Sequence, residues 1–377
     1  MSNNFLIPKS FVLNHPSRKT TSTATSKILA NSKSFDFHKS LKGYNCSPLV
    51  SLKSLSNDLN IKNLFVKDES ERFGLNAFKV LGASYAINHI LNNESNISVF
   101  CTATDGNHGR ALAWSANNQN KKCVVYVPEN TTDLRIDAII NEGAEVYKLQ
   151  MNYEKTCDYA KEMSQKHGWT LVQDTSWDNY EEIPSLIMSG YLTHFIEIEN
   201  QLQSIYNSEI DIIFLQCGVG SWAASCIWYF LNNYTGKTPK IVLVEPVESA
   251  GVFESFKLGS RSSPKGSYST IMAGLNCGIP SKNAWEIIKN GCDAVILISD
   301  TDAIDAIRKY YYPKGNDFRV VSGESGAAGL AGLVRCISDP DLNKLREHIN
   351  LNSKSNILLF NTEGATDIND FNQIINV

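Results

Sequence analysis

Lys79 has the sequence surroundings of a reactive amine. It ends the segment Phe73–Lys79, which is rich in small and apolar residues and follows the strand-like run Leu64–Val66. Removing a lysine from water disfavours its charged form, and the neutral amine is the nucleophile that condenses with an aldehyde. The alternative is a surface lysine whose stem covers apolar residues while its charge stays in water. The other polar segments decide between these two readings.

A polar turn at Thr104–Arg110 offers an amide and an anion site. It follows the strand-like run Val99–Thr104 and precedes a helical pattern. Gly106 lets the backbone approach a ligand closely, and a helix N-terminus favours a bound anion such as a carboxylate. Asn107 can donate or accept a hydrogen bond. A purely structural turn, with Asp105 as the helix cap, would use the same residues.

A second glycine-containing turn is suited to phosphate. It follows the apolar run Ile212–Leu215 and opens another helix. Gly218 and Gly220 free the backbone, so that successive N–H groups can surround a phosphate at the helix N-terminus. A Walker loop is excluded because no lysine follows, and the third glycine of the dinucleotide fingerprint is absent. We expect the phosphate ligands to be Gly218, Val219, Gly220 and Ser221.

Three further turns place polar residues after strands. Asp174 ends a strand-like run, although an aspartate there can equally serve the turn itself. Small residues at 322–329 open a helix, and the segment 361–367 follows the last strand and carries the hydroxyl of Thr362. Together with Lys79, these turns supply an amine, an amide, a phosphate site, carboxylates and a hydroxyl. Those are the groups that pyridoxal phosphate requires.

The elements that must position these turns alternate between short apolar runs and longer amphipathic stretches, which predicts an α/β fold with a mainly parallel sheet. Strands are expected at residues 64–67, 99–104, 122–128, 145–149, 170–173, 212–216, 240–245, 294–298 and 357–361. Helical spacing of apolar residues predicts helices at 110–118, 132–142, 153–167 and 183–202.

Two domains are expected from the length of 377 residues and from two series of strand–helix repeats. We assign residues 1–88 and 205–377 to a large cofactor-binding domain and residues 89–204 to a small domain. Ligands of open α/β sheets bind beyond the carboxyl ends of the strands. The site is therefore expected in the cleft between the domains.

The composition excludes several classes of protein. A net charge of −4 provides no basic excess to neutralise nucleic-acid phosphates. No apolar run reaches the roughly 20 residues that span a bilayer. Nine cysteines without a CxxC pair indicate reduced, buried thiols, and they indicate neither a zinc site nor a disulfide framework.

The N-terminus leaves targeting open. The first 35 residues hold five basic and no acidic residues, as in some transit peptides. The apolar runs Phe5–Ile7 and Phe11–Leu13 are instead typical of strands, and no secretory apolar core is present. We expect a cytoplasmic protein.

The chain resembles the fold-type II pyridoxal-phosphate enzymes, the group of tryptophan synthase β and threonine dehydratase, and more closely the diaminopropionate ammonia-lyases within it. The likeness covers nearly all of the chain from about residue 43 onward. Its motifs are VKDESERFGLNAFKVLGASYA (66–86), TDGNHGRALAW (104–114), MNYEKT (151–156), VQDTSW (172–177), TIMAGLNCG (270–278), GNDFRVVSGESGAAGL (315–330) and NTEGATD (361–367). The resemblance implies two open, twisted, mainly parallel sheets flanked by helices, with the cofactor in the interdomain cleft.

The resemblance also implies roles for individual residues toward the cofactor. Lys79 corresponds to the Schiff-base lysine, and Asn107 to the asparagine that faces the ring oxygen. Thr362 corresponds to the hydroxyl opposite the pyridine nitrogen, and residues 218–221 to the phosphate loop. The chain departs from the family at Trp222, which is bulkier than expected after that loop.

Toward the substrate, Asp105 and Asp174 correspond to two aspartates that abstract the α-proton from opposite enantiomers. Each requires a raised pKa, because an ordinary aspartate is a poor base near neutral pH. We expect the turn of Asp105, Gly106 and His108 to hold the substrate carboxylate.

The resemblance implies α,β-elimination of 2,3-diaminopropionate, in the D form, the L form or both, to pyruvate and two molecules of ammonia. The alternative is a serine or threonine dehydratase, or another lyase of β-substituted alanines, which shares Lys79 and Asn107 but does not need both aspartates. A non-catalytic scaffold is disfavoured because the full set of roles is present. The resemblance implies a homodimer with a small amino-acid substrate as its ligand, and neither nucleic acid nor membrane is an expected partner.

Overall fold

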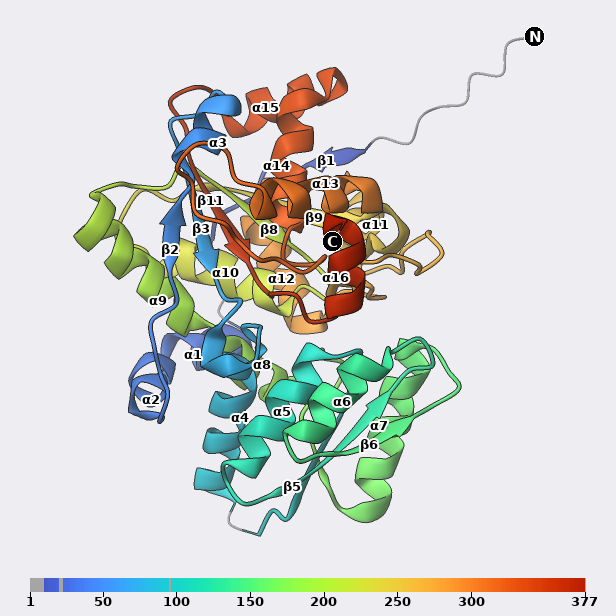
Figure 1. Cartoon of the computed structure of the whole chain (residues 1–377). Helices are drawn as coiled ribbons and strands as arrows, with labels where there is room; N and C mark the ends of the chain where they lie inside the picture. Colours follow the sequence, from blue (N-terminus) through green and yellow to red (C-terminus); the bar gives the residue numbers. More distant parts are fainter. Residues whose placement is uncertain (1–9, 20–22, 95, 377) are drawn as a thin grey trace.

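The strands form two sheets, each in its own lobe (Figure 1). The computed structural model describes residues 10–19, 23–94 and 96–376. The larger sheet contains, in spatial order, β1 (Phe11–Leu13), β10 (Ala294–Ile298), β9 (Lys240–Pro246), β8 (Ile212–Gln216), β11 (Asn356–Asn361), β3 (Asn63–Asp68) and β2 (Leu49–Ser51). The smaller sheet contains β6 (Glu145–Lys148), β5 (Lys122–Val127), β4 (Val99–Ala103) and β7 (Thr170–Leu171).

Both sheets are mainly parallel, as predicted. The smaller sheet is parallel throughout, and in the larger one only the edge strands β1 and β2 are antiparallel to their neighbours. Each strand predicted from the sequence is present. The strand-like run Phe11–Leu13 is β1, whereas Phe5–Ile7 lies outside the described residues. The three-residue strand β2 was not predicted, because it is too short to show a period and is defined by its pairing with β3.

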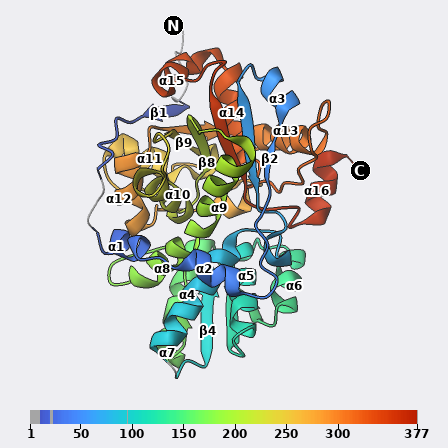
Figure 2. The same cartoon turned by 90° about the vertical axis from the view of Figure 1, so that its left-hand side faces the viewer.

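Helices flank both sheets (Figure 2). The α-helices are α1 (Ala24–Ala30), α2 (Ser34–Ser40), α3 (Lys53–Asp58), α4 (Lys79–Asn93), α5 (Asn107–Asn117), α6 (Asp133–Asn141), α7 (Tyr153–His167), α8 (Glu182–Gly190), α9 (Leu192–Gln201), α10 (Ser221–Asn232), α11 (Gly251–Leu258), α12 (Lys282–Gly291), α13 (Asp300–Tyr311), α14 (Ala328–Ser338), α15 (Asn343–Ile349) and α16 (Ile368–Ile375). The predicted helices 110–118, 132–142 and 153–167 correspond to α5, α6 and α7. The single helix predicted at 183–202 is instead the pair α8 and α9.

Helix α4 connects the two lobes. It packs against α5, which covers the smaller sheet, and against α8. One apolar core is shared by both lobes, since it contains Leu112 and Val125 as well as Ile213 and Leu358. The domain division at residues 88 and 204 stays a prediction, and α4 runs across the first of these boundaries. No helix in the described ranges is long and apolar enough to cross a membrane.

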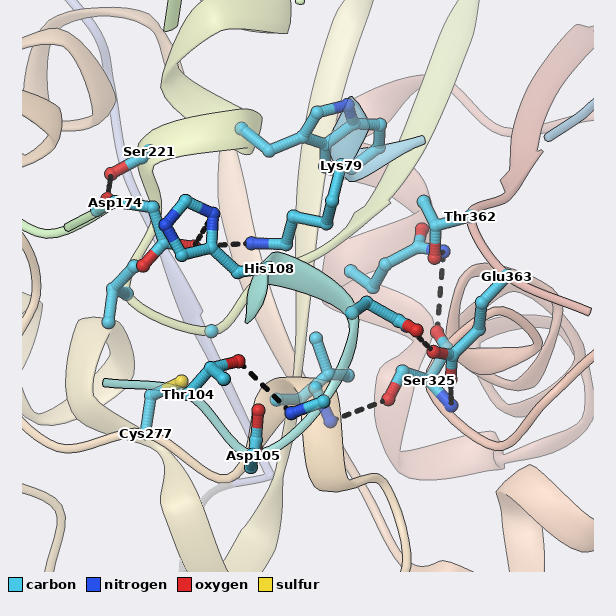
Figure 3. Close-up of a pocket in the computed structure, with 18 of the residues that line it drawn as sticks. Lys79, Thr104, Asp105, His108, Asp174, Ser221, Cys277, Ser325, Thr362 and Glu363 are labelled. Carbon is cyan, nitrogen blue, oxygen red and sulfur yellow. Dashed lines mark hydrogen bonds and ion pairs between the residues drawn. The ribbon is translucent and has the colours of Figure 1, made fainter. Parts of the chain in front are cut away.

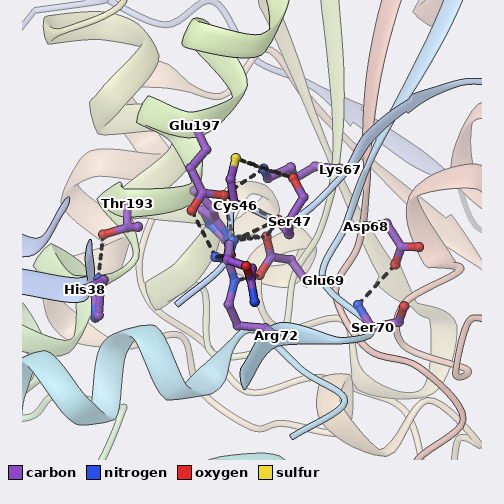
Figure 4. A network of polar contacts seen from close by, with 12 residues as sticks. His38, Cys46, Ser47, Lys67, Asp68, Glu69, Ser70, Arg72, Thr193 and Glu197 are labelled. Carbon is purple, nitrogen blue, oxygen red and sulfur yellow. Dashed lines mark hydrogen bonds and ion pairs between the residues drawn. The ribbon is translucent and has the colours of Figure 1, made fainter. Parts of the chain in front are cut away.

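A buried ionic cluster fixes the chain that leads from β3 to Lys79 (Figure 4). It consists of Lys67, Glu69, Arg72 and Glu197, whose side chains are 0 to 1% exposed. The Arg72 guanidinium lies 2.7 Å from Glu69 Oε2 and 2.7 Å from Glu197 Oε2. Lys67 Nζ lies 2.7 Å from the same Glu197 oxygen. Charges so far from water are tolerated only when they are paired and hydrogen-bonded.

The cluster holds a strained segment in place. Phe73 and Asn76, which lie between Arg72 and Lys79, both have left-handed backbone angles, with φ of 52° and 57°. A bulky residue rarely adopts that conformation unless its surroundings impose it. Ala77 then forms an antiparallel bridge with Glu363, which follows β11. Lys79 therefore begins α4 at a position set by both the cluster and the centre of the larger sheet.

Candidate active site

One cavity between the lobes gathers the site residues predicted from the sequence (Figure 3). It encloses about 960 Å³ between atoms, its open mouth included. Its walls include Lys79, Asp105, Gly106, Asn107, His108, Asp174, Gly218, Val219, Gly220, Ser221 and Thr362. These residues follow β4, β7, β8 and β11 or begin α4, so the cavity lies at strand ends, where ligands of open α/β sheets bind.

Lys79 lies in the wall as an ion-paired ammonium. Its Nζ is 2.6 Å from Asp174 Oδ2. Burial alone would lower the pKa of Lys79, but the charge and hydrogen bond of Asp174, together with Tyr191, hold that pKa above its ordinary value. The expectation that the pocket neutralises this amine by burial was therefore wrong for the protein without ligand, because a carboxylate shares the pocket.

The two predicted bases differ in environment. Burial raises the pKa of Asp105 to about 6, although the charges of Arg135 and Lys79 oppose the shift. Burial would also raise the pKa of Asp174, but Lys79 outweighs it and the pKa falls to about 2. The expected rise is thus present at Asp105. It is absent at Asp174, whose partner is Lys79.

The turn after β4 is braced from both ends. Thr104 Oγ1 accepts hydrogen bonds from the N–H groups of Gly106 at 3.0 Å and Gly109 at 3.3 Å. At the start of α5, the amide of Asn107 donates to Glu363 Oε2, and Glu363 Oε1 accepts from the N–H of Ser325 at 3.0 Å. The asparagine of one lobe is thereby joined to two loops of the other.

The predicted phosphate loop has free donors. Gly220 adopts φ 89°, and α10 begins at the next residue. Among the described residues, the N–H groups of Gly218 and Gly220 donate to no acceptor. A Cβ on Gly218 would lie 2.9 Å from Cys277 Sγ, so the loop has no space for a side chain there. Unpaired N–H groups at a helix N-terminus fit a phosphate.

The hydroxyl of Thr362 is set up to donate toward a ligand. Gln216 Nε2 lies within 3.0 to 3.3 Å of the carbonyl oxygens of Ser325, Gly326 and Phe360, which identifies it as the donor end of the amide. The same nitrogen donates to Thr362 Oγ1 at 3.0 Å. Since this hydroxyl accepts from Gln216, its own hydrogen is available for an acceptor such as a pyridine nitrogen.

Several cavity residues were not assigned a role from the sequence. They are Tyr153, Cys277, Ser325 and Glu363, which lie within motifs quoted above, and Arg135 and Gln216, which do not. A turn motif identifies the segment but not which side chain faces the ligand. Taken together, the amine, the free N–H groups and the donating hydroxyl fit pyridoxal phosphate.

Comparisons with known proteins agree with this fit. A family model described as "Pyridoxal-phosphate dependent enzyme" matches residues 41–362. Diaminopropionate ammonia-lyase of Escherichia coli K12 is 37% identical over 356 residues, covering 90% of this chain and 89% of that protein. The enzyme of that name from Salmonella typhimurium is 37% identical over 363 residues, covering 90% of each chain.

A solved structure extends the likeness to three dimensions. Diaminopropionate ammonia-lyase from Escherichia coli, in complex with an aminoacrylate-PLP azomethine reaction intermediate, superimposes with a TM-score of 0.89 at 35% identity. The match covers 97% of this chain and 96% of that one. The resemblance inferred from the motifs is confirmed: this chain belongs to the family of pyridoxal-phosphate dependent enzymes and shares nearly its whole length with the diaminopropionate ammonia-lyases.

Proposed function

We propose that the protein catalyses the pyridoxal-phosphate dependent α,β-elimination of 2,3-diaminopropionate to pyruvate and two molecules of ammonia. The observation that carries this proposal is that two aspartates, Asp105 and Asp174, share one cavity with Lys79. Two relatives that are 37% identical over 89% and 90% of their own length bear the name of this activity. A dehydratase would need the lysine but not a second carboxylate.

Pyridoxal phosphate, when bound, supplies an aldehyde that condenses with amines and a conjugated ring that stabilises negative charge at the substrate α-carbon. In the proposal, Lys79 is the amine that holds the aldehyde, and Asn107 donates to the ring oxygen. Residues 218–221 hold the phosphate through their N–H groups. Thr362 donates to the pyridine nitrogen through the hydrogen that its contact with Gln216 leaves available.

The two aspartates are assigned to opposite faces of the α-carbon. Asp105 has a pKa of about 6 and is ionised near neutral pH while remaining a useful base. Asp174 is a weak base as long as the Lys79 ammonium lies 2.6 Å from it. The Asp174 side chain is only 7% exposed. When Lys79 leaves the ion pair, this burial disfavours the charged carboxylate, so the pKa of Asp174 rises and Asp174 becomes a stronger base.

The remaining steps use groups already in the cavity. The substrate carboxylate docks against the backbone N–H groups of the turn of Asp105, Gly106 and His108, at the N-terminus of α5, and not against the His108 side chain. An amine leaves only after protonation, and Lys79 is the ammonium in position to deliver that proton. A hydroxyl at Thr362 cannot supply a full proton to the ring, as a carboxylic acid would, and this favours loss of the β-substituent over transamination.

The test is turnover of D- and L-2,3-diaminopropionate by the purified protein supplied with pyridoxal phosphate. Diaminopropionate should give two ammonia per pyruvate, and serine, if it reacts, one. Turnover of serine or threonine alone would support the dehydratase alternative. Absence of pyruvate from every substrate would reject elimination altogether.

We further propose that the protein acts as a cytoplasmic homodimer. All nine cysteines are free, and only Cys46 is exposed, which suits a reducing compartment. Exposed apolar side chains such as Leu258 and Phe318, at 61% and 70%, are candidates for a subunit contact. Light scattering on the purified protein measures the oligomeric state, and a monomer would contradict the proposal.

A further inference from the structure

His108 has one ring nitrogen without a partner, and it lies close to Asp174. Its Nε2 is 2.8 Å from the carbonyl oxygen of Val172, which only accepts hydrogen bonds, so Nε2 carries a proton. Its Nδ1 is buried, has no hydrogen-bond partner among the described residues, and is 4.0 Å from Asp174 Oδ2. Burial lowers the pKa of His108 and outweighs the charge of Asp174, which raises it, and the charge of Lys79 lowers it further. The ring is therefore neutral, with an unprotonated Nδ1 beside the carboxylate (Figure 3).

This arrangement suits a protonated Asp174 better than an ionised one. An ionised carboxylate and an unprotonated nitrogen are both acceptors, so no hydrogen bond forms between them. A buried acceptor without a donor is unfavourable. If Oδ2 holds a proton, its O–H can donate to Nδ1 once the two atoms approach by about 1 Å, and catalytic hydrogen bonds commonly shorten in this way when a ligand binds.

We propose that His108 is a positioning residue for Asp174, accepting a hydrogen bond from its carboxyl group while that group holds the substrate α-proton. The inference rests on the proposed function, in which Asp174 is a base. In the step concerned, the Cα–H bond breaks and an O–H bond forms at Oδ2. The electron pair stays with the substrate. The proton remains on Asp174 and is shared with Nδ1, so His108 acquires no charge.

Two neighbours of one oxygen atom have opposite preferences. Lys79 Nζ and His108 Nδ1 both face Asp174 Oδ2, at 2.6 Å and 4.0 Å. The ammonium favours the ionised carboxylate, and the bare ring nitrogen favours the protonated one. Departure of Lys79 from the ion pair thus changes the preferred protonation state of Asp174. No hydrogen bond or ion pair among the described residues joins His108 to Asp105, so the direct contact of His108 is with one base only.

Two substitutions separate the halves of the ring. In His108→Gln, the amide nitrogen can still donate to the Val172 carbonyl, but no acceptor replaces Nδ1. In His108→Asn, the amide oxygen replaces Nδ1, but the side chain is too short to reach Val172. We expect His108→Gln to lower kcat about tenfold for the enantiomer that depends on Asp174 and less than about twofold for the other, with KM unchanged. His108→Asn should retain most of the activity.

Three results would overturn the proposal. Equal losses for both enantiomers, or a rise in KM, would assign His108 to substrate binding. A larger loss in His108→Asn than in His108→Gln would make the Val172 contact the important one. Full activity of His108→Gln with both enantiomers would show that Nδ1 has no role. If the unsubstituted protein turns over neither enantiomer, the proposed function fails. The proposal on His108 is then tested by a measurement that needs no substrate.

Nuclear magnetic resonance on the cofactor-free protein supplies that second measurement. Nitrogen-15 shifts should identify a neutral ring protonated at Nε2 near neutral pH, and an imidazolium or an Nδ1–H tautomer would contradict the proposal. In a Lys79→Met background, a carbon-13 titration should give Asp174 a higher pKa with His108 than with His108→Gln. An equal or lower pKa with His108 would also reject it.

Discussion

The buried ionic cluster and the cavity wall contain the same kinds of charged side chain, but they differ in how completely these side chains are paired. In the cluster, Lys67, Glu69, Arg72 and Glu197 each have an opposite charge within 2.7 Å. In the cavity, Asp105 forms no ion pair among the described residues, and one nitrogen of His108 and one oxygen of Gln216 have no hydrogen-bond partner. Complete pairing holds the scaffold rigid, whereas incomplete pairing leaves groups that can bind and react.

The largest expected effect separates two ion-paired lysines, Lys67 and Lys79. Lys79→Ala should abolish turnover and the visible absorbance of the bound cofactor, because no other lysine lines the cavity among the described residues. Lys67→Met is the matched control from the cluster. It should keep both signals and instead lower the free energy of unfolding, since Glu197 loses one of its two cations. Loss of the absorbance in Lys67→Met but not in Lys79→Ala would mean that Lys67, and not Lys79, binds the cofactor.

The two aspartates should be the next to separate. Asp105→Asn and Asp174→Asn are each expected to lower kcat/KM by about 10²–10⁴-fold for one enantiomer of diaminopropionate, and for opposite enantiomers, since a positioned base contributes about that much. The measurement is pyruvate release from each pure enantiomer. Equal losses on both enantiomers would contradict the division of labour.

Breaking the cluster should affect stability before chemistry. Arg72→Met leaves Glu69 and Glu197 buried with less compensation, and removal of one partner of a buried pair costs about 3–5 kcal/mol. Urea unfolding of the cofactor-free protein measures this loss. A change below about 1 kcal/mol would mean that water enters the cluster and that it does not hold the Lys79 segment.

The smallest expected effect is a gain in stability at the site. The pKa of Asp105 is raised from 3.8 to about 6 in the folded protein, so its burial lowers stability progressively as the pH rises from about 4 to about 6. Above that range, Asp105→Asn should unfold with a free energy higher by about 3 kcal/mol. Below about pH 4 the difference should vanish, and a difference independent of pH would contradict the assignment.

The sequence predicted the segments that line the site better than it predicted the contacts between their side chains. Strand ends located Asp105, Asp174 and the loop at residues 218–221, because periodicity and turn residues are local signals. The expected rise in the pKa of Asp174 was wrong for the protein without ligand, because the expectation did not include the ammonium that shares the pocket. That ion pair joins Lys79 to a residue 95 positions later.

The side-chain contacts that the sequence did not predict also join distant parts of the chain. Asn107 meets Glu363 across 256 positions, and Glu197 meets Arg72 across 125. Such pairs depend on how the lobes pack, and no local pattern reports that. The short strand β2 was missed because only its pairing with β3 defines it. Motifs therefore identified which segments converge, but not which side chains meet.

The position of β11 has a consequence for how the protein is made. It is the last strand in the chain, yet it lies between β8 and β3, near the middle of the larger sheet. During synthesis, β3 and β8 must wait with open edges until residues 356–361 emerge from the ribosome, and open edges invite pairing with other chains. Thr362 and Glu363 come directly after that strand, so these two side chains reach the cavity only when the sheet is closed.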